Sequence, residues 1–345
     1  MSTVLDPRSI EREIARIRER ESNPYSSGVK TNLFTLVIFR KPGKREKDDP
    51  LAAALQYMLG RRPARIITID RVDAPETGVM VSGRCFPDRR NRGVCFEEVQ
   101  IESGEDGLGE DPGAWAPLLI RDLPVYAWWP DSLADSGFSW QKPILEAASL
   151  IDKLIVDSAN SQDSGAPASV TMGGLLSLRE KAGGSFFISD FAWRRGRVLR
   201  ELTARAFDQP EMRLLLSTIR SVALDGGTRA DSLLFSCWLS TRLGWAPAGG
   251  DDSAGAYRDR SGREIRLTHR APGSSLSEGF RIRFSFDAAE DMEIGCTRGG
   301  CVSNGAERGA YKFPSDGEIL LEEVDTLTRD PVYQEVLGRA GRIDG

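Results

Sequence analysis

Histidine is almost absent from this 345-residue sequence, which contains His269 and no other. A zinc site built from two or three histidines is therefore excluded, and a Ser-His-Asp or Cys-His catalytic set would have to use His269 itself. His269 ends an arginine-rich segment, and the sequence has no Gly-x-Ser-x-Gly motif that would supply a nucleophile. We therefore predict a structural role for His269, no metal site and no catalytic residue.

Cysteine is also scarce. An odd number of cysteines in a chain without an export signal predicts reduced thiols and not a disulfide framework. Cys296 and Cys301 lie in a glycine-rich turn with Arg298 between them. They form a candidate redox pair, because glycine permits close approach of the sulfurs and a nearby cation lowers a thiol pKa. Cys85 and Cys95 fall on two predicted hairpin strands and are placed to face each other. The five cysteines are at 85, 95, 237, 296 and 301.

Three further features are missing, and each excludes a class of partner. No apolar run approaches the roughly 18 residues of a membrane-spanning helix, and the charged N-terminus lacks the apolar core of a signal peptide. With 46 Lys and Arg against 51 Asp and Glu, the net charge of −5 gives no general attraction to nucleic acid. A Gly-Lys-Ser/Thr sequence is absent, and Gly107–Gly113 has the wrong spacing for a dinucleotide loop. We expect a soluble cytoplasmic protein without a cofactor, a nucleic-acid partner or a membrane partner.

The first half of the sequence predicts an α/β domain with a mixed sheet over residues 31–160. An apolar run at 33–39, a helix at 51–60 and a β-branched run at 65–70 form a βαβ unit, whose strands are parallel. Two alternating segments separated by a basic turn predict an antiparallel hairpin. The remaining expected elements are the hairpin strands 78–86 and 93–102, a short helix or turn at 114–120, a strand at 125–130, a helix at 142–150 and a strand at 153–157.

Two linkers divide the rest of the chain. Residues 7–21 place Ile10, Ile14 and Ile17 on one helix face, so residues 1–30 are predicted to be an N-terminal helix and linker. A Ser-, Ala- and Gly-rich stretch at 159–170 suggests a domain boundary. Residues 170–345 are predicted to form an α+β domain with helices first and antiparallel strands after them. Its expected helices lie near 171–182, 190–207, 229–243, 316–328 and 331–340, and its expected strands near 213–224, 264–269, 280–286, 292–296 and 309–313.

The densest charged feature begins at Asp190, a residue suited to cap a helix. Between 194 and 205 there are five arginines against Glu201 alone. Guanidinium groups beside the ring of Trp193 are suited to bind a phosphate or the acidic face of a partner. The alternative is a solvated helix face with i,i+4 pairs such as Arg197 with Glu201. The candidate partner-binding residues of this segment are Asp190, Trp193, Arg194, Arg195, Arg197 and Arg200.

Trp128 and Trp129 complete the candidate partner-binding set. Adjacent residues on a strand point to opposite faces of the sheet. Either both rings lie in the core, or one is exposed for sugar stacking or partner contact. The acidic segment 316–325 also carries an apolar stripe, and it predicts an ordinary amphipathic helix.

The order of several segments resembles one family, the glucose-6-phosphate dehydrogenase assembly proteins, OpcA. The resemblance covers roughly residues 8–245, and residues 246–345 match only in general character. One departure is the stretch 194–199, which is richer in arginine than the family pattern and lacks its second aromatic residue; partner specificity would differ there. The segments that carry the resemblance are Asn32–Ile38, Arg62–Ile67, Pro117–Pro130, Ile155–Ser158, Asp190–Trp193, Arg200–Leu202 and Phe207–Asp208.

The resemblance implies a non-catalytic protein that binds glucose-6-phosphate dehydrogenase and promotes its active oligomer or its response to substrate. Such an effect needs only that the chain binds the active state better. Two alternatives remain open. One is a sugar-phosphate- or nucleotide-binding enzyme, which needs convergent polar groups at the carboxyl ends of the strands. The other is a redox-sensing adaptor that uses Cys296 and Cys301.

Overall fold

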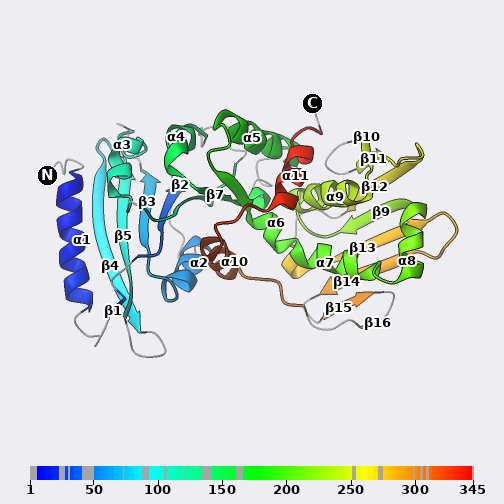
Figure 1. Ribbon diagram of the computed structural model, residues 1–345, viewed down its shortest axis with the longest axis horizontal. Helices are drawn as coiled ribbons and strands as arrows, with labels where there is room; N and C mark the ends of the chain where they lie inside the picture. The colour runs from blue at the N-terminus through cyan, green and yellow to red at the C-terminus, as the bar shows by residue number, and fades with distance from the viewer. Residues whose placement is uncertain are drawn as a thin grey trace.

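The computed structural model has two sheets that lie side by side with helices packed around them (Figure 1). It describes residues 6–22, 28–29, 32–40, 50–72, 74–87, 93–104, 107–120, 122–133, 141–160, 166–250, 254–270, 275–297, 300–303, 306–307 and 311–343. The first described helix, α1 (Pro7–Ser22), lies at the outer side of the first sheet, and the last, α11 (Pro331–Ala340), lies between the two sheets (Figure 1).

The first sheet is mixed, as predicted. Its order is β1-β5-β3-β2-β6-β7-β8, and β4 pairs with β5. Every described pairing is parallel except β4 with β5, the antiparallel hairpin. Its strands are β1 (Gly28–Val29), β2 (Thr35–Arg40), β3 (Arg65–Arg71), β4 (Gly78–Pro87), β5 (Gly93–Ser103), β6 (Val125–Trp129), β7 (Lys153–Val156) and β8 (Phe187–Asp190).

Helices cover both faces of this sheet, which explains why its central strands are continuous apolar runs. All five residues of β6 are buried. One face packs against α2 and α10, and the other against helices that include α4, α5 and α11. These helices are α1 (Pro7–Ser22), α2 (Pro50–Leu59), α3 (Pro112–Trp115), η1 (Ala116–Leu118), α4 (Gln141–Glu146), η2 (Ala148–Leu150), α5 (Ala168–Lys181), α10 (Asp316–Asp325) and α11 (Pro331–Ala340).

The second sheet has the order β10-β11-β12-β9-β13-β14-β15-β16. In β13 the buried and exposed side chains alternate, so this sheet has one face in the core and the other toward solvent. Its strands are β9 (Ile219–Asp225), β10 (Ala246–Gly250), β11 (Ala254–Arg258), β12 (Glu264–Arg270), β13 (Gly279–Phe286), β14 (Met292–Thr297), β15 (Gly300–Ser303) and β16 (Ala306–Glu307). The accompanying helices are α6 (Phe191–Arg195), α7 (Arg197–Ala206), α8 (Pro210–Leu215), η4 (Leu216–Thr218), α9 (Arg229–Leu243) and η5 (Leu276–Glu278).

The structure corrects two expected strands. The predicted strand 213–224 is helical up to Thr218, and only Ile219–Asp225 is extended. Pro210 fixes the first turn of α8, because its ring presets the helical φ angle. In the predicted strand 309–313, residues 309 and 310 lie outside the described residues, and 311–313 form no strand.

The sheets do not divide at the Ser/Ala/Gly segment 159–170. β8 follows this segment in the sequence, yet it pairs in parallel with β7 and completes the first sheet. The C-terminal helices also return to the first sheet, where Leu320 of α10 and Val336 of α11 are fully buried in its two cores. The domain limits 31–160 and 170–345 stay a prediction, but the chain crosses between the two sheets more than once.

The N-terminal helix α1 packs against β4 and β5, and charged groups hold it there. Nη1 of Arg65, a buried arginine of β3, donates to Glu11 at 2.5 Å. Nε of Arg65 donates to Glu97 of β5 at 2.9 Å, and Arg18 of α1 pairs with the same carboxylate. The predicted helix is therefore confirmed, and it forms part of the first sheet's packing. Among the described helices, none is long and apolar enough to cross a bilayer.

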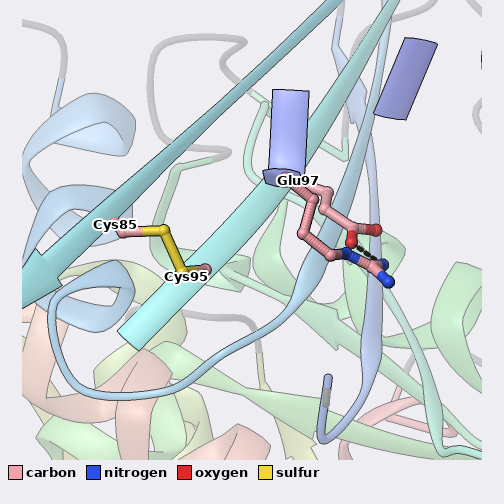
Figure 2. Close-up of a disulfide and its surroundings, with 4 residues drawn as sticks. Cys85, Cys95 and Glu97 are labelled. Atoms are coloured by element: carbon pink, nitrogen blue, oxygen red, sulfur yellow. Dashed lines mark hydrogen bonds and ion pairs between the residues drawn. A yellow bond between two sulfur atoms is a disulfide. The ribbon is translucent and has the colours of Figure 1, made fainter. Parts of the chain in front are cut away.

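The structure corrects the prediction of reduced thiols. Cys85 on β4 and Cys95 on β5 are directly opposite each other, 4.0 Å apart between Cα atoms, and form a disulfide (Figure 2). Cys296 and Cys301 are likewise opposite on β14 and β15, with Cα atoms 4.1 Å apart, and are also bonded. Opposed positions on neighbouring antiparallel strands are adjacent, and this pairing brings the two cysteines of each pair together.

A thiol count tests this pairing. For chain purified without reductant and then unfolded, we expect one reactive thiol, from the buried Cys237. After reduction, all five cysteines should react. Titration with a chromogenic disulfide reagent measures both values. Five reactive thiols before reduction would show that neither disulfide forms. Three would show that only one of the two forms.

Candidate functional site

The tryptophans predicted for partner contact are buried. Trp128 and Trp129 point to opposite faces of β6, as expected, but their exposed fractions are 3% and 0%. Trp128 stacks on Phe191 with ring centroids 5.7 Å apart, whereas Trp129 packs in the core on the other face. Of the two alternatives, the one with both rings in the core is therefore confirmed and the one with an exposed ring is wrong, because helices cover both faces of the first sheet. Trp193 is also buried, at 3% exposure.

Asp190 is fully buried at the carboxyl end of β8, where it caps α6 as predicted. Its Oδ1 accepts the backbone N–H groups of Ala192 at 3.0 Å and Ser158 at 3.1 Å. The hydroxyl of Tyr333 on α11 donates to Oδ2 at 3.3 Å. Burial, and then the negative charge of Asp157, raise the pKa of Asp190 to about 7. The residue thus ties β8, α6 and α11 together.

The raised pKa of Asp190 makes stability depend on pH. The ordinary value is 3.8, so between about pH 4 and pH 7 the folded chain keeps a proton that the unfolded chain has lost. Burial also raises the pKa of Asp231 to about 6, which acts in the same direction. We therefore expect the urea midpoint to fall as pH rises from 5 to 8. Asp190→Asn should flatten this dependence, and an equal slope in the variant would contradict the assignment.

The predicted arginines meet the acidic helix α10, which lies about 120 residues further along the chain. Nη1 and Nη2 of Arg195 donate to the two oxygens of Asp157 at 3.0 and 2.6 Å. Nη2 also donates to Oδ1 of Asp316 at 2.9 Å. Burial alone would lower the pKa of Arg195, but the two carboxylates outweigh it and raise that pKa. Arg194 pairs with Glu323, whose side chain is 0% exposed.

Arg200 and Arg197 differ in their surroundings. Arg200 lies 3.3 Å above the ring of Trp193 and donates to the carbonyl of the same residue at 2.9 Å. Burial lowers the pKa of Arg200 to about 9. The side chain of Arg197 is 58% exposed and pairs with Glu201 and Glu322, both at 3.3 Å. The predicted Arg197–Glu201 pair is therefore present.

Lys153 is a part of this cluster that sequence reasoning missed. It begins β7 within an apolar run, and its side chain is 1% exposed. Its Nζ donates to Oε2 of Glu323 at 3.0 Å and to the Glu323 carbonyl at 2.7 Å. It also donates to the carbonyl of Thr326. A cation at the carboxyl end of α10 satisfies carbonyls that lack partners within the helix. An isolated lysine at the start of a buried strand was the available signal.

The candidate site is therefore an internal ionic network that joins the first sheet, α6 and α10. Its cations are held by carboxylates of the same chain, so they are not poised to bind an external phosphate. His269 lies elsewhere, on β12, at 8% exposure, with Nε2 3.2 Å from the Gly226 carbonyl. Burial lowers the pKa of His269. Within the described ranges, no three His, Cys, Asp or Glu side chains form a metal-binding group.

Two family models match this chain. One, described as the glucose-6-phosphate dehydrogenase subunit N-terminal domain, matches residues 56–170. The other, described as the C-terminal domain of that subunit, matches residues 187–337. The second match extends well beyond residue 245, the point after which the sequence segments resembled the family only in general character.

Cyanobacterial relatives agree with the family models. A Nostoc punctiforme protein named for the OxPP cycle and OpcA is 30% identical over 82% of this chain and 65% of its own length. A protein of the same name from Synechocystis is 29% identical over 56% of this chain and 40% of its own length. The chain thus spans less than two thirds of the length of these relatives.

Among solved structures, a 3-ketoreductase from Actinomadura kijaniata covers 91% of this chain and 96% of its own length. The identity is 11% and the TM-score is 0.46, a similarity on which we build nothing. The two family models together span most of the sequence, in the order N-terminal and C-terminal domain. The chain therefore belongs to the OpcA family of glucose-6-phosphate dehydrogenase subunits, as its sequence segments predicted.

Proposed function

We propose that this chain is a non-catalytic partner of glucose-6-phosphate dehydrogenase in the cytoplasm, which binds the enzyme and favours its active state. The observation that carries the proposal is the pair of family matches, to residues 56–170 and 187–337. Preferential binding to the active state shifts the enzyme's population toward that state. A tenfold change in apparent substrate affinity requires only about 1.4 kcal/mol of coupling.

The internal network supports a non-catalytic role. The most perturbed groups, Asp190, Arg195 and Arg200, contact other residues of the same chain and complete its packing. A catalytic acid or base must instead reach a substrate atom. Strongly perturbed pKa values occur in structural ion-pair networks as well as in active sites. The positions of these three groups favour the structural explanation.

We propose Arg197 as the contact residue among those predicted from the sequence. Its guanidinium lies at the outer rim of the network, beside the exposed carboxylates of Glu201 and Glu322. Rim charges steer association and contribute to partner specificity. The buried Trp128, which stacks on Phe191 of α6, and Trp193, which lies under Arg200 of α7, would act indirectly, by holding these helices in place. Trp129 would act only through the core on the other face of the sheet.

Size-exclusion chromatography of a mixture with the host's dehydrogenase tests this proposal. We expect both proteins in one peak of higher mass than either alone. Arg197→Glu should weaken the complex several-fold and lower the free energy of unfolding by only about 1 kcal/mol or less, because the site is exposed. The matched control is Arg220→Glu, an exposed arginine of β9 in the other sheet. Separate elution under all conditions would contradict partner binding, and equal effects of the two variants would contradict the role of Arg197.

A further inference from the structure

The outer edge of the first sheet is a long and regular strand. Among the described strands, β4 pairs with β5 alone. Its residues pair with β5 without a bulge, and proline occurs only at its last position. Figure 1 shows β4 beside α1 at the outer side of the molecule. The edge of such a strand presents N–H and C=O groups that another strand can bond.

The other described sheet edges are protected against added strands. At β8, Nε2 of Gln334 on α11 donates to the carbonyl of Ile188 at 3.0 Å. β10 contains Pro247 and a bulge, and β1 and β16 have only two residues each. Natural proteins protect sheet edges by these means, because an open edge invites association. Within the described ranges β4 has none of these protections, so its edge is a candidate interaction surface.

The pairing with β5 shows which residues of β4 face the open edge. The N–H of Glu97 on β5 donates to the Ala64 carbonyl at 3.0 Å, so the backbone groups of Glu97 point away from β4. Gly83, which lies opposite Glu97, is therefore in a non-hydrogen-bonded pair. Because the pairing alternates along the strand, Val79 and Val81 are in such pairs too and direct their N–H and C=O groups outward. No described residue bonds to the outward groups of these two valines.

A groove of about 330 Å³ lies between α1 and the open edge. Val79 and Val81 are half-buried and line this groove, so another chain can reach the edge. On its α1 side the groove begins with an acid, Asp6, and ends with a base, Arg16, whose side chain is 76% exposed. The α1 residues that line the groove are Asp6, Ser9, Ile10, Arg12, Glu13 and Arg16.

The sequence of β4 is complementary to itself in one antiparallel register. A two-fold axis at Met80 places Val79 opposite Val81 of the partner subunit, and each of the two such pairs exchanges both N–H···O bonds. Met80, which is 56% exposed, then meets its own copy. The exposed Arg84 lies opposite Glu76 of the partner subunit in this register, and neither residue has an ion-pair partner in the described part of the chain. Opposite charges that face each other across two strands attract.

The charges of α1 fit the same symmetry. Asp6 and Arg16 lie at the two ends of the α1 side of the groove. A two-fold axis through the middle of the groove therefore brings Asp6 toward Arg16 of the partner subunit. Both sets of charges, on β4 and on α1, are thus matched within this one sequence, which identifies a second copy of the chain as the occupant of the edge.

We propose that two copies of this chain associate through their β4 strands, antiparallel about a two-fold axis at Met80, so that their first sheets become continuous. The main-chain hydrogen bonds of the added strand supply affinity, and the paired charges fix the register. The proposal goes beyond the dehydrogenase-partner function and does not depend on it, since its test uses this chain alone.

The mass of the chain in solution tests the proposal. Light scattering after size-exclusion chromatography measures this mass over a wide range of chain concentration. We expect twice the mass of one chain at high concentration and dissociation on dilution. A single-chain mass at every concentration would overturn the proposal, and would leave the edge to an extended segment of another protein.

An exchange of two charges tests the register. Arg84→Glu places a carboxylate opposite Glu76 of the partner subunit and should weaken the dimer about tenfold. Glu76→Arg places two guanidinium groups together and should have the same effect. The double variant restores an attractive pair on each side of the axis and should dimerise as well as the natural chain. A double variant as weak as either single variant would overturn the register.

Two matched variants locate the surface. Met80→Lys places two ammonium groups beside the two-fold axis and should leave the chain monomeric where the natural chain is dimeric. Val170→Lys makes the same kind of change on α5, at a residue that is 57% exposed, and should leave the dimer intact. Both side chains are exposed in the single chain, so both variants should fold. Equal masses for the two variants would overturn the surface.

Hydrogen exchange of the natural chain gives a test without any variant. The amides of Val79 and Val81 should exchange slowly in the concentrated dimer and fast after dilution. The amides of Met80 and Ser82, which bond to β5 in the single chain, should exchange slowly at both concentrations. Fast exchange of the two valine amides in a sample that is dimeric by mass would also overturn the surface.

Discussion

Replacing Glu323 by alanine should lower the free energy of unfolding by about 3–5 kcal/mol. The Glu323 side chain is 0% exposed and pairs with both Lys153 and Arg194. Its removal leaves the buried ammonium of Lys153, 1% exposed, without a carboxylate. An uncompensated charge inside a protein costs several kcal/mol, because the interior solvates it poorly. Urea unfolding followed by circular dichroism measures the loss.

Glu322→Ala is the matched control for this variant. Glu322 is the preceding residue of α10, but its side chain is 44% exposed. Its partners are the exposed Arg197 at 3.3 Å and, more distantly, Arg194 at 3.9 Å. Exposed ion pairs contribute about 0–1 kcal/mol. We therefore expect a small change for Glu322 and a large change for Glu323. Equal, small losses for the two variants would contradict the docking of α10 through a buried ion pair.

Arg195→Ala should cost about 3 kcal/mol. The guanidinium of Arg195 joins Asp157, at the end of β7, to Asp316, at the start of α10. Without it, Asp157 stays buried beside Asp190 with no cation between α6 and the sheet. The negative charge of Asp157, which already raises the pKa of Asp190, then has no bound guanidinium to offset it.

The pH dependence separates this electrostatic effect from a simple loss of packing. The charge of Arg195 lowers the pKa of the buried Asp231, which burial raises to about 6. Without Arg195 that pKa should rise further, so stability should decline more steeply between pH 5 and pH 8 than in the natural chain. Arg197→Ala, the control, removes an arginine that is 58% exposed and should change stability by less than about 1 kcal/mol. A parallel pH profile for Arg195→Ala would show that the side chain acts through packing alone.

Local patterns predicted most elements of the fold correctly. The periodicity of apolar side chains, together with the positions of proline and glycine, was enough to predict three elements. They are the strand that ends at Arg40, the helix that begins at Pro50 and the hairpin around residue 90. The mixed sheet followed from the βαβ order. The strand β8 was not predicted, and the segment 159–170 was interpreted as a domain boundary. A composition shift of this kind looks the same in a linker and in a crossover connection.

The candidate site was harder to predict, because its partners are distant in the sequence. The arginines of α6 and the acids of α10 were each recognised as charged features, but their pairing depends on where α10 folds back. Likewise, the exposure of Trp128 depends on whether a helix covers that face of the sheet. Contacts between residues distant in the sequence leave no local pattern. The one local signal of the buried ionic network was the position of Lys153 in an apolar run.

The most direct test of the proposed function is the steady-state kinetics of the host's glucose-6-phosphate dehydrogenase, with and without a saturating amount of this chain. The substrate is glucose 6-phosphate, and the assay is run in both reducing and oxidising buffer, because two disulfides are formed in the structure. We predict a lower KM or a higher kcat in the presence of the chain. Unchanged KM and kcat in both buffers would contradict the account.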